Sequence, residues 1–168
     1  MKNLVLSNIL RFVGLILLQI LILNFVYLGG YMLPFVYILA VLMMPTRMSR
    51  VWVLVVAFAS GAVVDIFCNV PGFHAFSCTM MAFFRLLVGN RILTRGEPID
   101  IDVPGAHNVP FQQLSGYLLV MSMVYSVTYF LIESFTLGNF WWMVLAMALS
   151  TLVTWLFMLL CQLFVGRK

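Results

Sequence analysis

The residues with the clearest chemical potential lie on one apolar stretch that holds a single carboxylate. Ala57, Gly61 and Asp65 recur every four residues and therefore share one face of a helix. Small residues at this spacing let two membrane helices approach closely. A carboxylate at the centre of a membrane costs about 3 kcal/mol on insertion scales, so it is usually turned away from lipid. We therefore expect Asp65 to point at a neighbouring helix.

Two polar side chains are candidate partners for Asp65. At a rise of about 1.5 Å per residue, Asp65 lies about 21 Å from the inner end of its run and Asn24 lies about 20 Å from the start of its own run. The two residues therefore share a level in the outer half of a membrane. His74 follows a Pro-Gly turn just after Asp65 and is the second candidate. This cluster either ties helices together, which we favour, or lines a ligand site or partner groove; it comprises Asp65, Asn24, His74, Gly61 and Ala57.

Arg85 is the other charged residue inside an apolar run. It lies about 9 Å from the inner end of its run, and its level differs from that of Asp65 by roughly 12 Å. We therefore do not expect the two to pair. Arg85 is expected to make an inner-face contact, either by extending its guanidinium to the cytoplasmic headgroups or by meeting a partner chain.

The remaining polar residues form no catalytic or metal-binding motif. The chain has 2 His, 3 Cys and 5 acidic residues, without metal-ligand spacing, a Gly-rich phosphate loop or a Ser/His/Asp arrangement of plausible geometry. We therefore expect a protein that is not an enzyme and holds no cofactor or metal. The net charge of +4 comes from scattered residues rather than a basic patch, which argues against a nucleic-acid partner.

The composition indicates that lipid is the solvent for this chain. Of the 168 residues, 64% are hydrophobic and 8% are charged, whereas soluble domains carry about 25% charged residues. Six apolar runs approach the length of about 20 residues that a membrane-spanning helix needs. The sequence therefore predicts an all-α polytopic membrane protein of one domain, with spans at 12–28, 31–44, 51–70, 73–93, 114–133 and 140–165 and a loop at 94–113.

The second run is the weakest of the six. Its length corresponds to about 21 Å of helix, less than the ~30 Å hydrocarbon core. A re-entrant or tilted segment is therefore an alternative there. Pro34 suits the first turn of a helix in this run, and a crossing at this point keeps the following cations on the same side as the others.

The charges outside the runs favour six crossings. If all six runs cross, every such cation falls on one side of the membrane: Lys2, Arg11, Arg47, Arg50, Arg91, Arg95, Arg167 and Lys168. Positive residues stay cytoplasmic. We therefore expect both termini in the cytoplasm.

A series of residues resembles a known family. Phe58-x-x-Gly61-x-x-x-Asp65 is followed by Gly72-Phe73-His74-Ala75 and then Arg85. This pattern resembles that of the MreD family, the small multi-pass rod shape-determining proteins of bacteria. Further residues that carry the resemblance are Gln19, Asn24, Pro34, Pro45 and Arg47.

The resemblance implies a membrane scaffold of the cell-elongation machinery in the bacterial cytoplasmic (inner) membrane. Such a scaffold supports lateral peptidoglycan synthesis and regulation of cell shape. Its implied partners are an MreC-like single-span protein, a RodA-like glycan polymerase, a class B penicillin-binding transpeptidase and MreB filaments on the cytoplasmic side. The implied bundle is similar to the six-helix substrate-binding subunits of energy-coupling-factor transporters.

The alternative function is a substrate-binding subunit of a small-molecule, vitamin-type uptake transporter. Such subunits typically use an Ala-x-x-x-Ala-like motif on the first helix, whereas the first run here has only Gly14 as a small residue. A polar outer cup is also expected of them, but the outer loops at 28–31 and 134–139 are very short. Both points favour the scaffold over uptake, which we keep as the alternative; a flippase-like role for a lipid-linked precursor is a more distant third hypothesis.

Overall fold

The computed structural model describes residues 2–22, 33–46, 48–94, 103–104, 109–134 and 140–165. All regular secondary structure in these ranges is helical, which confirms the all-α prediction. The elements are α1 (Lys2–Leu21), α2 (Ile38–Leu42), α3 (Arg50–Cys68), α4 (Phe73–Phe84), the π-helix η2 (Arg85–Gly89), α5 (Asn90–Thr94), α6 (Phe111–Ser134) and α7 (Phe140–Val165).

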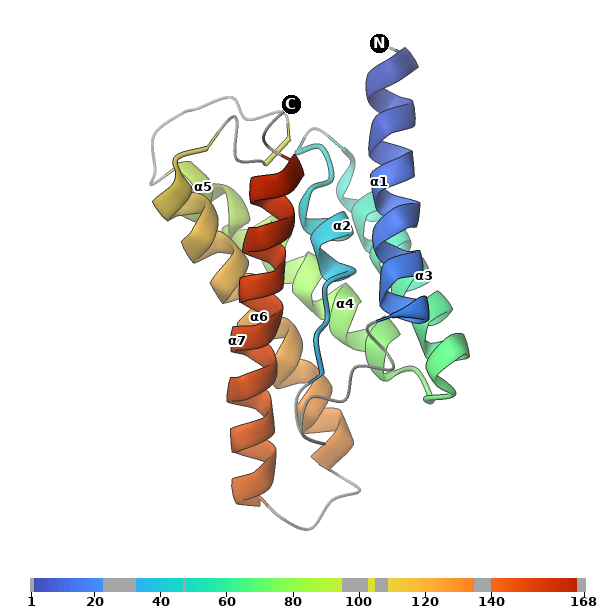
Figure 1. Ribbon diagram of the computed structural model, residues 1–168, viewed down its shortest axis with the longest axis vertical. Helices are drawn as coiled ribbons and strands as arrows, with labels where there is room; N and C mark the ends of the chain where they lie inside the picture. Colours follow the sequence, from blue (N-terminus) through green and yellow to red (C-terminus); the bar gives the residue numbers. More distant parts are fainter. Residues whose placement is uncertain are drawn as a thin grey trace.

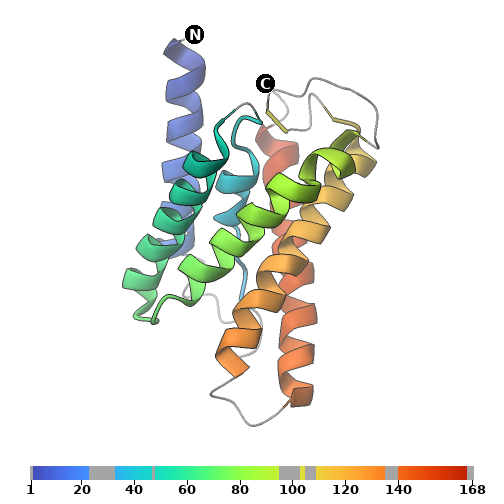
Figure 2. The same ribbon diagram turned by 180° about the vertical axis from the view of Figure 1, so that it is seen from behind.

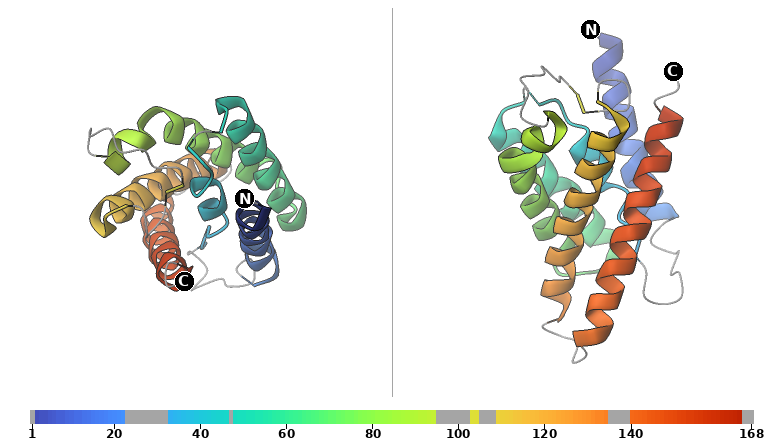
Figure 3. Two further views of the ribbon diagram at one scale, coloured as in Figure 1. Left: turned by 90° about the horizontal axis from the view of Figure 1, so that it is seen from above. Right: turned by 90° about the vertical axis from the view of Figure 1, so that its left-hand side faces the viewer.

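The helices form an elongated bundle around a short central segment. Successive segments run alternately between the two ends of the bundle, so that the start of α1 and the end of α7 lie at the same end (Figure 1). Helices α3 and α4 form an antiparallel hairpin on the opposite side from α7 (Figure 2). Viewed along the bundle, α2 lies in the middle, with the longer helices around it (Figure 3).

Most of the expected helices are present with small changes in their ends. The runs 51–70, 114–133 and 140–165 correspond to α3, α6 and α7. The run 73–93 corresponds to one continuous helical stretch formed by α4, η2 and α5. The first run differs, because α1 begins at Lys2, well before residue 12, and the described helix ends at Leu21. Residues 23–28 of that run, and most of the 94–113 loop, lie outside the described residues.

The prediction of a helix over 31–44 was wrong. Residues 33–37 are not helical, and α2 occupies only Ile38–Leu42. Pro34 therefore lies in the non-helical part rather than in a first turn. A pyrrolidine ring permits this because it fixes φ near −65° and removes a hydrogen-bond donor. Tyr37 already has helical backbone angles, with φ −60° and ψ −24°, so we call residues 33–36 the extended segment.

The turn between α3 and α4 depends on two residues with positive φ. Asn69 ends α3 at φ 55°, and its N–H bonds the carbonyl of Asp65. Gly72 begins α4 at φ 83°, a conformation that L-residues with a Cβ rarely adopt. Pro71 lies between them. The sequence therefore encodes a reversal of chain direction that brings α4 back along α3.

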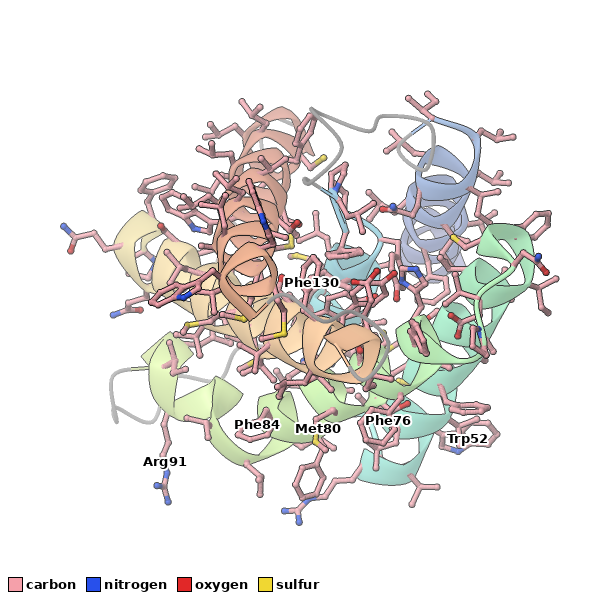
Figure 4. All side chains as sticks on the ribbon, turned by 90° about the horizontal axis from the view of Figure 1, so that it is seen from below. Trp52, Phe76, Met80, Phe84, Arg91 and Phe130 are labelled. Carbon is pink, nitrogen blue, oxygen red and sulfur yellow. The ribbon has the colours of Figure 1, made fainter. Side chains whose placement is uncertain are left out.

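The outer surface of the bundle is apolar and its interior holds polar groups. Within the described ranges, three helices are long and apolar enough to cross a membrane: Arg50–Cys68, Phe111–Glu133 and Trp141–Leu163. Trp52, Phe76 and Phe84 point outward from α3 and α4 (Figure 4), whereas buried positions include Gln19, Asp65 and Arg85. A soluble bundle would place these side chains the other way round. The fold is thus that of a helical membrane protein.

Gly61 sets the distance between α3 and α4. A Cβ at this position would lie 2.5 Å from the Cα of Ala75 and 2.5 Å from the carbonyl oxygen of His74, both backbone atoms of α4. Ala57 and Gly61 are both buried in this contact face of α3. The expected close approach of two helices at the small residues is confirmed.

We predict that Gly61→Ala destabilises the protein, because neither helix backbone can move away without losing its packing. The expected loss is about 1–3 kcal/mol of unfolding free energy, as for overpacked cores. Gly14→Ala is the matched control, since a Cβ at Gly14 would meet nothing within 4 Å and alanine favours a helix by up to about 1 kcal/mol. Thermal unfolding in detergent measures both. Equal unfolding temperatures for the two variants would contradict the prediction.

Candidate functional site

Asp65 binds the first turn of α4. Its Oδ1 accepts a hydrogen bond from the backbone N–H of His74 at 2.9 Å, and its Oδ2 accepts one from that of Ala75 at 2.8 Å. These N–H groups are among the four at a helix start that have no partner within the helix. Gly72, the residue before the helix, has no side chain to supply an acceptor. The Asp65 carboxylate of α3 therefore caps the N-terminus of α4. A negative charge is favourable at this position because of the helix dipole.

The expectation that Asp65 faces another helix is confirmed, but Asp65 contacts backbone N–H groups of α4 instead of a polar side chain. His74 is a partner of Asp65 through its backbone N–H. Asn24 lies outside the described residues, so its predicted contact stays a prediction. The face formed by Ala57, Gly61 and Asp65 is already covered by α4. It is therefore not an open groove for a partner helix, and that interpretation was wrong.

The extended segment is held by side chains from two helices. On one side, the Gln19 amide of α1 donates to the carbonyl oxygen of Pro34 at 2.8 Å and accepts from the N–H of Val36 at 2.9 Å. On the other side, two hydroxyls of α7 accept hydrogen bonds at 3.0 Å: Ser150 from the N–H of Leu33 and Thr154 from that of Phe35. Side chains thus supply this segment with the hydrogen bonds that the backbone of a helix would make internally.

The geometry explains why these side chains match the segment. In an extended chain, the polar groups of successive residues point to opposite sides. Residues 33 and 35 therefore face α7, and residues 34 and 36 face α1. Two residues of extended chain span about 6.6 Å, and four residues of helix span about 6 Å. The spacing between Ser150 and Thr154 along α7 is thus close to the repeat of the backbone that they bind.

Arg85 is buried and bonds to the end of α2. Its exposed fraction is 7%. One guanidinium nitrogen donates to the carbonyl oxygen of Val41 at 3.0 Å and another donates to that of Met44. The expected contact with headgroups or a partner at the inner face was wrong. A cation at the C-terminal end of a helix is favourable, and unpaired carbonyls there would otherwise lack donors.

The π-helix η2 begins at Arg85 and ends at Gly89. A single turn of π-helix inside an α-helix often occurs at functional sites because it changes the direction of a side chain. A Cβ at Gly89 would lie 3.3 Å from both Cγ of Arg85 and a ring carbon of Tyr117. The hydroxyl of Tyr117 in turn donates to the carbonyl oxygen of Leu42 at 3.4 Å. Gly89 therefore leaves room for Arg85 and Tyr117 to reach α2 together.

A chain of three titratable side chains lies in the middle of the bundle. The hydroxyls of Tyr37 and Tyr125 are 2.9 Å apart, and the Tyr125 hydroxyl lies 2.7 Å from Nδ1 of His74. Their exposed fractions are 0%, 0% and 4% respectively. The rings of Phe35 and Tyr129 pack against this chain, with centroids 5.0 Å apart. We call these five residues the aromatic cluster.

Sequence reasoning did not identify several of these residues. Tyr37, Tyr125 and Ser150 received no role, and Gln19 was noted only as part of the family resemblance. One signal was present: Tyr117, Tyr125 and Tyr129 are separated by multiples of four and so share a face of α6. A face of tyrosines in a membrane helix indicates hydroxyls that need partners inside the bundle.

The chemistry available in the described part of the chain is that of hydrogen bonds and protons. No group of three or more His, Cys, Asp or Glu side chains that could hold a metal ion occurs there. Cys78 and Ser60 are in contact at 3.7 Å, and Cys78 is not part of a disulfide. The class that the fold and these contacts define is a helical membrane protein with an internally bonded polar core.

No protein-family model, curated protein or solved structure matches this chain.

We predict that Thr154→Val destabilises the protein, because the buried N–H of Phe35 loses its acceptor while the side-chain volume is kept. An unpaired buried donor costs about 1–3 kcal/mol. Thr151→Val on the same helix is the control, since the Thr151 hydroxyl donates to the carbonyl oxygen of Met147 in its own helix. Unfolding in detergent should occur at a clearly lower temperature for Thr154→Val. A larger effect for Thr151→Val would show that the extended segment does not depend on α7.

We predict that Arg85→Met lowers stability more than Arg91→Met does. Arg85 bonds two carbonyl oxygens near the end of α2, and charge-assisted hydrogen bonds contribute about 1.5–3 kcal/mol. Arg91 is exposed. Limited proteolysis in detergent, followed by identification of the first cleavage site, provides the measurement. Cleavage of the Arg85→Met variant should begin near residues 38–46; an unchanged cleavage pattern would contradict the role of Arg85.

Proposed function

We propose that this chain is a non-enzymatic scaffold of the bacterial cell-elongation machinery, which supports lateral peptidoglycan synthesis and cell shape together with an MreC-like protein. The observation that favours it is the use of the buried polar residues. Gln19, Asp65 and Arg85 each bond to backbone atoms of this same chain. Polar side chains that bond to the protein's own backbone stabilise a rigid framework, and a scaffold requires such a framework in its membrane domain.

The proposal includes six crossings with both termini in the cytoplasm. Its support is the alternation of the segments between the two ends of the bundle (Figure 1). The start of α3 and the short helix α5 lie toward the same end of the bundle as the start of α1 (Figure 1); α3 begins with Arg50, and α5 contains Arg91. Cations concentrate on the cytoplasmic side of membrane proteins. The segment 33–46 then crosses as an extended segment plus a short helix, which membranes tolerate where such a backbone is buried in protein.

A partner helix has to dock on the outer faces of the bundle, because α4 covers the small-residue face of α3. The candidates remain an MreC-like single-span protein, a RodA-like polymerase, a class B penicillin-binding transpeptidase and MreB filaments at the cytoplasmic end. The resemblance at Gly61, Asp65, Gly72, His74 and Arg85 supports this choice of partners, since each of these residues has a distinct structural task here.

The experiment is co-purification of the tagged chain with the MreC-like protein of its host from detergent-solubilised membranes, combined with depletion of the chain in that host. We expect recovery of the single-span protein and a change from rods to round cells on depletion. An unrelated multi-pass protein with the same tag is the control. Normal rods after depletion, together with recovery no better than the control, would overturn the proposal.

A further inference from the structure

The hydrogen-bonded chain of His74, Tyr125 and Tyr37 has no task in holding the backbone. Gln19, Asp65, Arg85, Ser150 and Thr154 bond to backbone atoms. In contrast, Nδ1 of His74 and the hydroxyls of the two tyrosines bond to one another. Three apolar side chains of similar shape would fill the same space without any hydrogen bond to satisfy. An ionisable side chain inside a membrane is by default a candidate functional site.

We propose that the hydrogen-bonded side chains of His74, Tyr125 and Tyr37 form a proton-binding site, with the imidazole of His74 as the group that takes up the proton. The protonation state of this site is transmitted to the extended segment. The proton joins the ring so that both nitrogens carry hydrogen. Nδ1–H then donates to the hydroxyl oxygen of Tyr125, and the hydroxyl hydrogen of Tyr125 turns toward Tyr37. No bond other than N–H and hydrogen bonds changes.

Burial of the His74 ring opposes a positive charge on it, and the aromatic cluster offsets part of that cost. The ring centroid of His74 lies 4.9 Å from that of Tyr129, 5.7 Å from that of Phe35 and 6.1 Å from that of Tyr37. Cations are attracted to aromatic faces within about 6 Å, and the attraction is greater where water is excluded. The carboxylate of Asp65 lies 2.9 Å from the backbone nitrogen of His74 and adds a negative charge nearby.

Other titratable groups near His74 come from every element around it. On α4 itself Cys78 lies one turn further along, and Arg85 lies about 16 Å away at three turns. The groups on the surrounding elements are Asp65 on α3, Tyr125 and Tyr129 on α6, and Tyr37 just before α2. Asp65 is the only carboxylic acid among these groups, and its ionised form favours the protonated ring.

The route to the rest of the fold runs through Tyr37. This residue lies where the extended segment meets α2, and its backbone N–H is 3.4 Å from the Gln19 side-chain oxygen. A change in which hydroxyl donates between Tyr125 and Tyr37 therefore acts on the part of the chain that α1 and α7 hold. Protonation of His74 would thus alter the hydrogen bonds that keep the extended segment in place. This inference stands apart from the proposed scaffold function and does not depend on it.

The test is an NMR titration of the full chain in lipid nanodiscs with ¹⁵N-labelled histidine and ¹³Cζ-labelled tyrosine. The sequence has two histidines and six tyrosines, so His107→Gln leaves one histidine, and single Phe substitutions assign the tyrosines. On acidification from pH 8 to pH 3 we expect the His74 ring to become protonated, and the Tyr125 and Tyr37 signals to move with the same midpoint. A His74 ring that stays neutral throughout, in protein shown to be folded, would overturn the proposal.

A matched pair of variants separates the proton site from general packing. Tyr125→Phe removes the acceptor for Nδ1–H and should weaken proton binding by about threefold or more, because charge-assisted hydrogen bonds are about twice as strong as neutral ones. Tyr117→Phe removes a hydroxyl of the same helix, one that donates to the carbonyl oxygen of Leu42. This variant should leave the midpoint of the His74 titration unchanged. Equal shifts in the two variants would also overturn the proposal. If Tyr125→Phe does not fold, the shared midpoint of the three wild-type signals decides the question.

Discussion

The structure depends on one constraint: a backbone buried in hydrocarbon must find all its hydrogen bonds within the protein. The extended segment lies at the centre of the bundle without the internal bonds of a helix. Its buried polar groups are bonded instead by Gln19 on one side and by Ser150 and Thr154 on the other. Helices α1 and α7 are thereby attached to the same piece of chain. The position of both outer helices follows from this requirement.

The two buried charges serve the same constraint at helix ends. Asp65 accepts from the first N–H groups of α4, and Arg85 donates to carbonyl oxygens at the end of α2. Each charge has the sign that the helix dipole favours at that end. Helix ends inside a membrane cannot rely on water for these bonds. A carboxylate and a guanidinium are suited to the task because each engages two backbone groups at once, and this explains why both are buried without being paired to each other.

Several features of the bundle were predictable from local patterns. The apolar runs at 51–70, 73–93 and 140–165 predicted α3, the α4–α5 stretch and α7 closely, since helix length and hydropathy are properties of neighbouring residues. The small residues at Ala57 and Gly61 predicted the close contact between two helices. The inward direction of Asp65 followed from the cost of a charge in lipid. The 31–44 run was mistaken because its apolar character does not distinguish a buried helix from a buried extended segment.

The sequence by itself determined that this chain is helical, belongs in a membrane and carries one carboxylate between helices. These properties depend on composition and on spacings of a few residues. Only the tertiary structure decided that residues 33–37 lie outside any helix, that Arg85 reaches α2 and that His74 and Tyr37 both bond to Tyr125. The reason is distance along the chain: the hydroxyls that hold the extended segment lie more than a hundred residues from it. No local pattern shows which remote side chain will supply a missing hydrogen bond.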